Sequence, residues 1–68
     1  MILNMSVLDF ANHFIPSNEN VRLIKDTVII FDDLLENLYY DTSGVLRMIV
    51  TMVSASDGTL CLSVREPN

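Results

Sequence analysis

A single cysteine, Cys61, in a chain of 68 residues excludes an intrachain disulfide. A structural zinc site is disfavoured as well, because one cysteine and one histidine, His13, do not supply the usual four thiolate and imidazole ligands. Chains of this length bury only roughly 60% of their unfolded surface, so many of them rely on a disulfide, a metal or a partner chain. The sequence therefore predicts one small domain, residues 1–68, that binds neither metal nor cofactor and forms homo-oligomers.

The charge of the chain limits the kinds of partner it can bind. Nine acidic residues oppose four basic ones, which gives a net charge of −5 at pH 7. Because phosphate backbones are bound through Lys and Arg, direct binding of nucleic acid is disfavoured. An acidic surface either keeps a protein soluble or attracts basic protein surfaces, and both interpretations stay open.

The start of the chain and its apolar runs bear on localisation. Residues 1–5 contain no basic cluster of the kind that begins a secretion signal. No apolar run approaches the roughly 18 residues of a membrane-spanning helix. We therefore expect a soluble cytoplasmic protein without membrane contact.

Two segments have the apolar spacing of helices. Ser6 and Asp9 have the spacing of an N-terminal capping box, and the apolar residues after them recur at helical intervals. This pattern predicts a helix through residue 15, which Pro16 then ends. The same cap spacing recurs at Asp33 and Glu36 and predicts a second helix that ends near residues 41–44.

The remaining segments are typical of strands. Residues 21–25 and 27–31 are rich in β-branched side chains, although the register between them stays open. Residues 45–55 and 59–65 flank a strong hairpin signal. The predicted order is α-β-β-α-β-β, an α+β fold in which two short helices cover one face of a four-stranded antiparallel sheet.

Two loops are conceivable for the last hairpin, and they expose different faces. A two-residue loop, Asp57-Gly58, would mix polar and apolar residues on the face that carries Leu62. A three-residue loop that also includes Ser56 pairs Met52 with Leu62 and separates apolar from polar residues better. Because a slip of one residue reverses the faces of a strand, we expect the three-residue loop.

The three-residue loop leaves an apolar strip on the outer face of the sheet, away from the helices. Exposed strips of this kind often mark interfaces, although scattered exposed aliphatic residues are also common. We expect a homodimer that forms through this face or through an edge of the sheet. The members of the strip are Val45, Ile49, Val53 and Cys61.

Few residues indicate chemistry. His13 and Asp9 lie one helical turn apart and could form an oriented base, but the sequence places no nucleophile beside them, so we predict no catalytic residue. The densest acidic cluster surrounds the second predicted helix and lacks the glycine and the alternating oxygen ligands of an EF-hand. It serves either as helix caps and solvated charge or as a patch for a basic protein groove. Its members are Asp32, Asp33, Glu36 and Asp41.

The segments VLDF (residues 7–10) and VRLI (residues 21–24), the acidic helix and the closing SDGTLCLSV (residues 56–64) resemble small acidic proteins encoded by phages and prophages of gut Firmicutes. The resemblance spans most of the chain and contains no motif on which functional residues could be transferred. Some proteins of this class are anti-CRISPR or other anti-defence proteins that block a host nuclease by occupying its nucleic-acid site. The resemblance thus implies a mobile-element inhibitor of a host defence protein.

Two functions are predicted as alternatives. The first is a non-enzymatic protein-binding module that acts through its acidic surface. Its most specific version is a mobile-element inhibitor of a host defence protein. The second is a small structural component of a phage or a larger assembly, for which the apolar strip matters and the charge does not.

Overall fold

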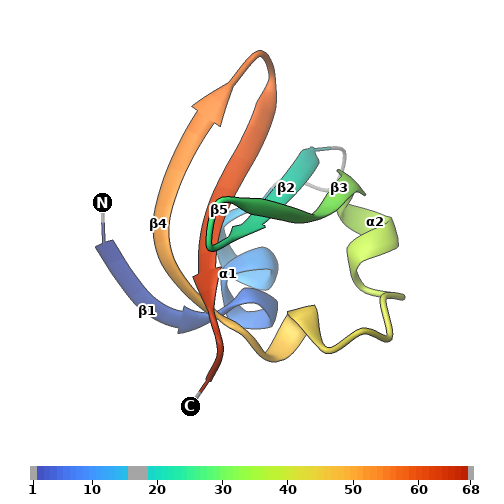
Figure 1. Ribbon diagram of the computed structural model, residues 1–68. Helices are drawn as coiled ribbons and strands as arrows, with labels where there is room; N and C mark the ends of the chain where they lie inside the picture. The colour runs from blue at the N-terminus through green and yellow to red at the C-terminus, as the bar shows by residue number, and fades with distance from the viewer. Residues whose placement is uncertain (1, 16–18, 68) are drawn as a thin grey trace.

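The computed structural model describes residues 2–15 and 19–67, which form an α+β fold around a five-stranded mixed sheet. Its elements are β1 (Ile2–Ser6), α1 (Val7–Phe14), β2 (Asn20–Lys25), β3 (Val28–Leu34), α2 (Leu35–Leu38), a 3-10 turn η1 (Val45–Arg47), β4 (Ile49–Ser56) and β5 (Thr59–Arg65). The spatial order of the strands is β1-β4-β5-β2-β3 (Figure 1).

The prediction of an α+β fold is confirmed. A purely antiparallel sheet of four strands is wrong, because the chain adds β1 and pairs β2 with β5 in parallel.

The parallel pair β2 and β5 forms the centre of the sheet. Its register sets Val21 beside Leu60 and Leu23 beside Leu62. Leu23 and Leu62 are completely buried, so the two central strands contribute the largest buried side chains of the sheet. Burial of apolar area is the main term that stabilises such a small fold.

Helix α1 begins where the sequence predicts. The Ser6 hydroxyl accepts a hydrogen bond from the backbone N–H of Asp9 at 3.1 Å, the interaction that defines an N-cap. Val7 and Phe10 are buried on the sheet side. The predicted helix is confirmed up to its cap at Ile15, whereas Pro16, which was expected to end it, lies outside the described residues.

Helix α2 is shorter than predicted. The expected start at Asp33 is wrong, because β3 continues through Leu34 and the helix has only four residues. The Asp33 carboxylate accepts a hydrogen bond from the neighbouring Leu34 N–H at 2.7 Å instead of capping a helical turn. Leu35 and Leu38 still bury their side chains, so the short helix keeps the apolar contacts that made the segment look helical.

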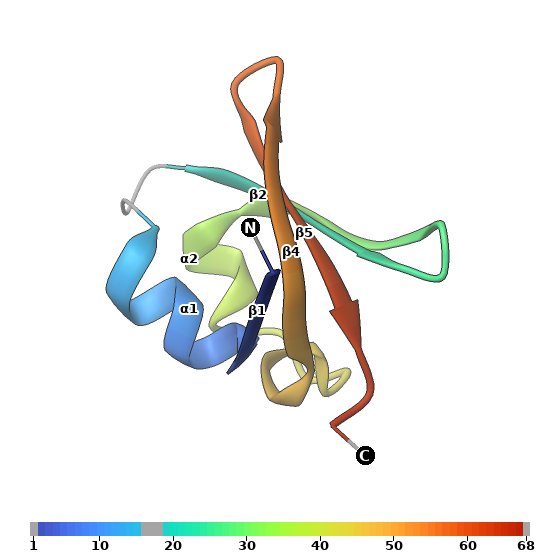
Figure 2. The same cartoon turned by 90° about the vertical axis from the view of Figure 1, so that its left-hand side faces the viewer.

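Both helices lie on the same side of the sheet, as Figure 2 shows. Their apolar side chains share one core with those of the strands. The buried members of this core are Val7, Phe10, Ala11, Ile15, Val21, Leu23, Leu35, Leu38, Val45, Val50, Leu62 and Val64. The Cα radius of gyration is 10.5 Å, close to the ~11 Å expected for this length.

The β4–β5 hairpin has the two-residue loop, and the expected three-residue loop is wrong. Ser56 pairs with Thr59 and Val53 pairs with Leu62. Asp57 and Gly58 both have positive φ, of 52° and 76°, the backbone geometry of a tight primed turn. Asp-Gly is a preferred sequence for that turn, so local turn chemistry decides the register.

A β-bulge in β4 explains why the two-residue loop does not mix polar and apolar faces. The register shifts between Val50 and Met52, which leaves Thr51 as the extra residue. The Thr51 hydroxyl donates to the backbone carbonyl of Ser63 at 3.1 Å. Beyond the bulge Val50 returns to the core side opposite Val64. The expected faces were wrong because they assumed strict alternation through this point.

The apolar strip expected on the outer face is therefore not a single surface. Val45 lies in η1 rather than in a strand and is 3% exposed within the core. Val53 packs against the core, Ile49 is half-buried, and Cys61 is buried in the strand between the core residues Leu60 and Leu62. The assignment of these four residues to one solvent-facing homodimer strip is wrong, because the two-residue loop and the bulge together change which side chains share a face.

The turn between β2 and β3 is strained. Asp26 and Thr27 have φ of 51° and 66°, a region that β-branched residues rarely adopt. We expect Thr27→Gly to raise the free energy of unfolding by about 1 kcal/mol, because glycine adopts this conformation without a steric penalty. Urea denaturation measures the change. Thr59→Gly, in the regular strand β5, is the control and is expected to lower stability. A loss of stability in Thr27→Gly would contradict the strain.

Candidate functional site

The acidic residues predicted as one patch lie on different parts of the surface. Asp32 and Asp33 are neighbours in β3, so their side chains point to opposite faces of the sheet. On the outer face, Asp32 accepts hydrogen bonds from Arg22 Nε at 3.2 Å and from Asn20 Nδ2 at 3.1 Å. Asp32 is thus part of a polar cluster with its own cation.

The other three acidic residues surround α2. Asp33 and Glu36 lie at its start, and both are exposed. Asp41 lies beyond its end, where its carboxylate accepts hydrogen bonds from the backbone N–H of Ser43, at 2.7 Å, and from the Ser43 hydroxyl. The structure therefore brings Asp33 and Glu36 together at one end of α2, and places Asp41 at the other end.

Asp33 differs from an ordinary exposed carboxyl in the hydrogen bonds that it accepts. The Leu34 backbone N–H, and then the Asn37 side chain, donate hydrogen bonds that hold the pKa of its carboxyl below the usual value. A lowered folded-state pKa stabilises the fold above the unfolded pKa, and this contribution is lost as the pH falls through the folded pKa. These hydrogen bonds therefore favour the charged form of the Asp33 carboxyl.

Removal of the Asn37 amide should shift the titration of Asp33. We expect Asn37→Ala to raise the pKa of the Asp33 carboxyl towards its usual value, and to leave the part of the shift that Leu34 causes. An NMR titration of the carboxyl group measures the change. Asn12→Ala is the matched control, because Asn12 accepts a hydrogen bond from the Tyr39 hydroxyl instead. An unchanged Asp33 titration in Asn37→Ala would contradict the contact.

Two ion pairs join segments that are distant in the sequence. Arg22 pairs with Asp32 at 3.2 Å, and Lys25 pairs with Glu66 at 2.7 Å. Glu66 raises the pKa of Lys25 through its hydrogen bond and its charge, so this pair stabilises the fold below the unfolded pKa of lysine and is lost as the pH rises through the folded pKa. Seven of the nine acidic residues lie outside these two ion pairs: Asp9, Glu19, Asp26, Asp33, Glu36, Asp41 and Asp57.

The only histidine is engaged by the main chain of its own helix. His13 Nδ1 lies 2.8 Å from the backbone oxygen of Asp9, so its contact in α1 is with the peptide group and not with the Asp9 carboxylate. Within residues 2–15 and 19–67, no three His, Cys, Asp or Glu side chains are grouped closely enough to hold a metal ion. In the same ranges no helix has the length and apolar character needed to cross a membrane.

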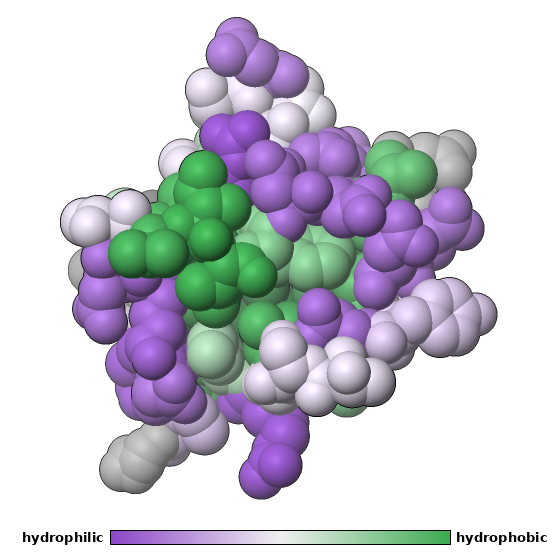
Figure 3. Space-filling view, turned by 45° about the vertical axis from the view of Figure 1, so that its right-hand side comes forward, coloured by the Kyte–Doolittle hydropathy of each residue, from purple (hydrophilic) through white to green (hydrophobic). Residues whose placement is uncertain are grey.

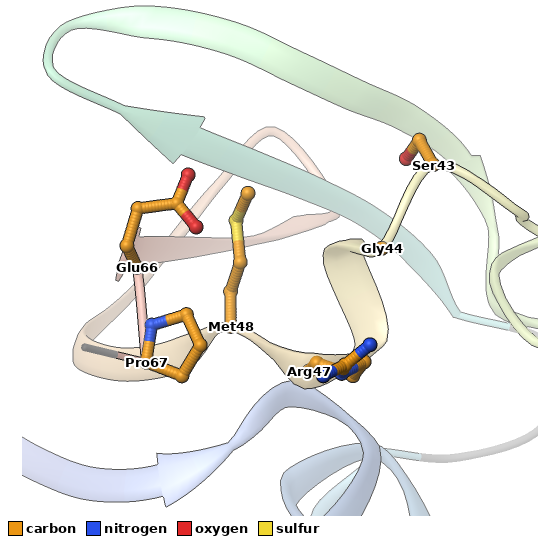
Figure 4. Close-up of a pocket in the computed structure, with 6 residues that line it drawn as sticks. All are labelled: Ser43, Gly44, Arg47, Met48, Glu66 and Pro67. Atoms are coloured by element: carbon orange, nitrogen blue, oxygen red, sulfur yellow. The ribbon is translucent and has the colours of Figure 1, made fainter.

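A surface pocket, which sequence reasoning did not predict, forms where the C-terminal end of β5 meets the loop before β4 (Figure 4). Its volume is about 260 Å³, and its charged groups are Arg47 and Glu66. Met48 points between Glu66 and the loop that carries Ser43, as Figure 4 shows. The pocket is lined by Ser43, Gly44, Arg47, Met48, Glu66 and Pro67. Because it holds one cation and one anion, it does not extend the acidic surface.

Strand β3 forms one edge of the sheet and exposes apolar residues. Val28 is 58% exposed and Ile29 is 53% exposed, although both lie in a strand. The space-filling view shows a compact group of hydrophobic side chains bordered by hydrophilic ones (Figure 3). We call residues Val28–Leu34 the β3 edge. It combines exposed apolar side chains at its start with two carboxylates near its end.

Comparison of the chain with protein-family models, with curated protein sequences and with solved structures finds no match. The resemblance to small acidic phage and prophage proteins therefore stays a prediction. The functional argument depends on the charge, the exposed edge and the contacts described above.

Proposed function

We propose that this protein is a non-enzymatic, cytoplasmic protein-binding module whose acidic surface engages a basic region of its partner. The observation that carries the proposal is the pair of exposed carboxylates at the start of α2, Asp33 and Glu36, which belong to the seven carboxylates outside the two ion pairs. Unpaired surface charge of one sign steers association with oppositely charged surfaces. In its sharpest form, the protein is a mobile-element inhibitor that occupies the basic nucleic-acid groove of a host defence protein.

Co-purification from a bacterial host at two salt concentrations tests the proposal. We expect the bound partner to be retained at about 50 mM salt and released at about 500 mM, because salt screens charges that face solvent. The double variant Asp33→Asn and Glu36→Gln should retain less partner at low salt. Its control is Asp26→Asn with Asp57→Asn, which removes the same charge at two tight turns where asparagine is well tolerated.

Three results would reject the acidic-surface proposal. The first is the absence of any retained partner at low salt. The second is retention that salt does not change. The third is equal retention by the two double variants, since that would make the position of the carboxylates near α2 irrelevant.

A second candidate function is that of a small assembly component that forms homo-oligomers. The exposed apolar residues Val28 and Ile29 on an edge strand favour it, because unprotected edges pair with other chains. Light scattering distinguishes the two functions. A monomer of about 7.7 kDa at high concentration contradicts the assembly function.

A further inference from the structure

We propose that the β3 edge binds a short, extended and basic segment of the partner, which adds to the sheet as a further antiparallel strand. Apolar residues of that segment contact Val28 and Ile29, and a Lys or Arg contacts Asp33. This inference rests on the proposed function and specifies the chemistry of the partner that the acidic surface engages.

The topology leaves the β3 edge open. Strand β3 is the last strand of the sheet and is paired with β2 alone. A two-residue turn closes on the pair Lys25 and Val28, which exchange hydrogen bonds in an antiparallel hairpin. In the next pair, Ile24 and Ile29, the backbone groups point away from each other. The N–H and C=O of Ile29 are therefore directed outward, where an added strand can bond to them.

A bulge sets the length of segment that this edge can accept. The register shifts between Leu23 and Ile24, so β3 carries Ile30 as an extra residue. Ile30 and Phe31 both pack partly against the core. The apolar side chains of the β3 edge that stay exposed are those of Val28 and Ile29 before the bulge and that of Leu34, 40% exposed, after it. Because regular pairing does not run through a bulge, an added strand pairs regularly only beside Val28 and Ile29, and the long side chain of its Lys or Arg extends past the bulge to Asp33.

The charges of the β3 edge disfavour a second copy of this chain as the occupant. If two antiparallel edges match their apolar residues 28–31, Asp33 of each copy lies opposite Asp26 of the other. A different register between the two β3 edges, shifted towards the end of each strand, separates Asp33 from Asp26. It then places Asp32 or Asp33 opposite apolar side chains of the other copy. Directly opposed like charges destabilise a strand pair.

A basic segment is complementary to the β3 edge in charge and hydrophobicity. The Asp32 carboxylate already has Arg22 as its cation, whereas Asp33 is exposed and lies outside both ion pairs. An antiparallel segment that begins with basic residues and continues with apolar ones meets Asp33 first and Ile29 afterwards. A cation then faces Asp33 and apolar side chains face Ile29, so the segment is complementary to the β3 edge on both sides of the bulge.

A synthetic peptide tests the inference directly. The probe is an end-capped, fluorescein-labelled peptide that begins Arg-Arg and continues Val-Thr-Val-Thr, and its binding to the intact protein is followed by fluorescence anisotropy. We expect Ile29→Lys to weaken binding at least about tenfold. Met52→Lys is the matched control, because Met52 is 50% exposed on β4, a strand paired on both sides, and its replacement should leave binding unchanged.

Two further changes separate the backbone contact from the charge contact. Ile29→Pro removes the outward N–H and should abolish binding, while circular dichroism confirms that the fold is retained. Asp33→Asn should weaken binding of the Arg-Arg peptide and reduce its salt dependence. A peptide that begins Glu-Glu should not bind the unmodified protein.

Three results would overturn the inference about the edge. One is no binding of the Arg-Arg peptide by the unmodified protein. Another is an equal loss of binding in Ile29→Lys and Met52→Lys. The third is a stable dimer that Ile29→Lys dissociates, because the occupant would then be a second copy. If the peptide fails to bind while partner retention still depends on salt and on the carboxylates near α2, the edge inference is wrong and the acidic-surface proposal stands.

Discussion

Replacing Leu62 by alanine is expected to lower the free energy of unfolding by about 3 kcal/mol. Leu62 is completely buried in β5, between Val53 of β4 and Leu23 of β2. Truncation of a buried leucine loses its transfer free energy and leaves a cavity that close-packed neighbours fill only in part. Since small domains have total stabilities of about 5 kcal/mol, the variant should retain only about 2 kcal/mol and populate the unfolded state to roughly 4%.

Equilibrium unfolding in urea measures this loss for Leu62→Ala. Met52→Ala is the control, because Met52 lies on the neighbouring strand β4 and is half exposed, so its truncation should cost less than about 0.5 kcal/mol. Similar losses in the two variants would mean that Leu62 is not at the centre of the core.

Local signals in the sequence were sufficient for several elements. The Ser6 and Asp9 spacing placed the start of α1, because an N-cap is an interaction within one helical turn. The bounds of β5 were predicted as residues 59–65, since its alternating pattern follows directly from a turn signal. The α+β class followed from the number and kind of these elements.

Features that depend on contacts between distant segments were missed. The Thr51 hydroxyl at the bulge donates to the Ser63 carbonyl across the hairpin. The sequence of β4 alone contains no signal for this bulge. The parallel pairing of β2 with β5 joins residues 39 positions apart, as the contact of Asn20 with Thr59 shows. Strand β1 was missed because residues 2–6 become a strand only through pairing with β4.

The same limit applied to the candidate site. The sequence identified Asp32 and Asp33 as neighbours in a charged cluster, but only their place in a strand separates them onto two faces. The partner of Asp32 came from β2, and that of Lys25 came from the end of the chain. An edge of the sheet was considered as a homodimer surface, but β3 was not identified as the strand that forms it, because the edges of a sheet are known only when the order of its strands is known.

Replacing Val45 by lysine is expected to lower the free energy of unfolding by about 3 kcal/mol or more, because it buries an unpaired charge. Val45 is 3% exposed in η1, and its side chain belongs to the core that α1 and β4 share. Thermal unfolding followed by circular dichroism measures the loss. Ile49→Lys is the matched control, since Ile49 is only half-buried at the start of β4 and its long replacement can extend its ammonium group into water.

The Val45 and Ile49 variants also decide between the two hairpin registers. If both residues lay on one solvent-facing strip, as the three-residue loop requires, both lysine variants would stay folded and would change only the oligomeric state. In the structure, where Val45 is buried in η1 and Ile49 is half-buried at the start of β4, Val45→Lys strongly destabilises the protein and Ile49→Lys does not. A Val45→Lys variant that folds but no longer dimerises would contradict the register. It would indicate that Val45 and Ile49 lie in a dimer interface. If only Val45→Lys is destabilised, Val45 belongs to the core and not to an exposed strip. The exposed apolar residues of the sheet are then ones such as Ile29 and Met52, and of these two only Ile29 lies on an open edge.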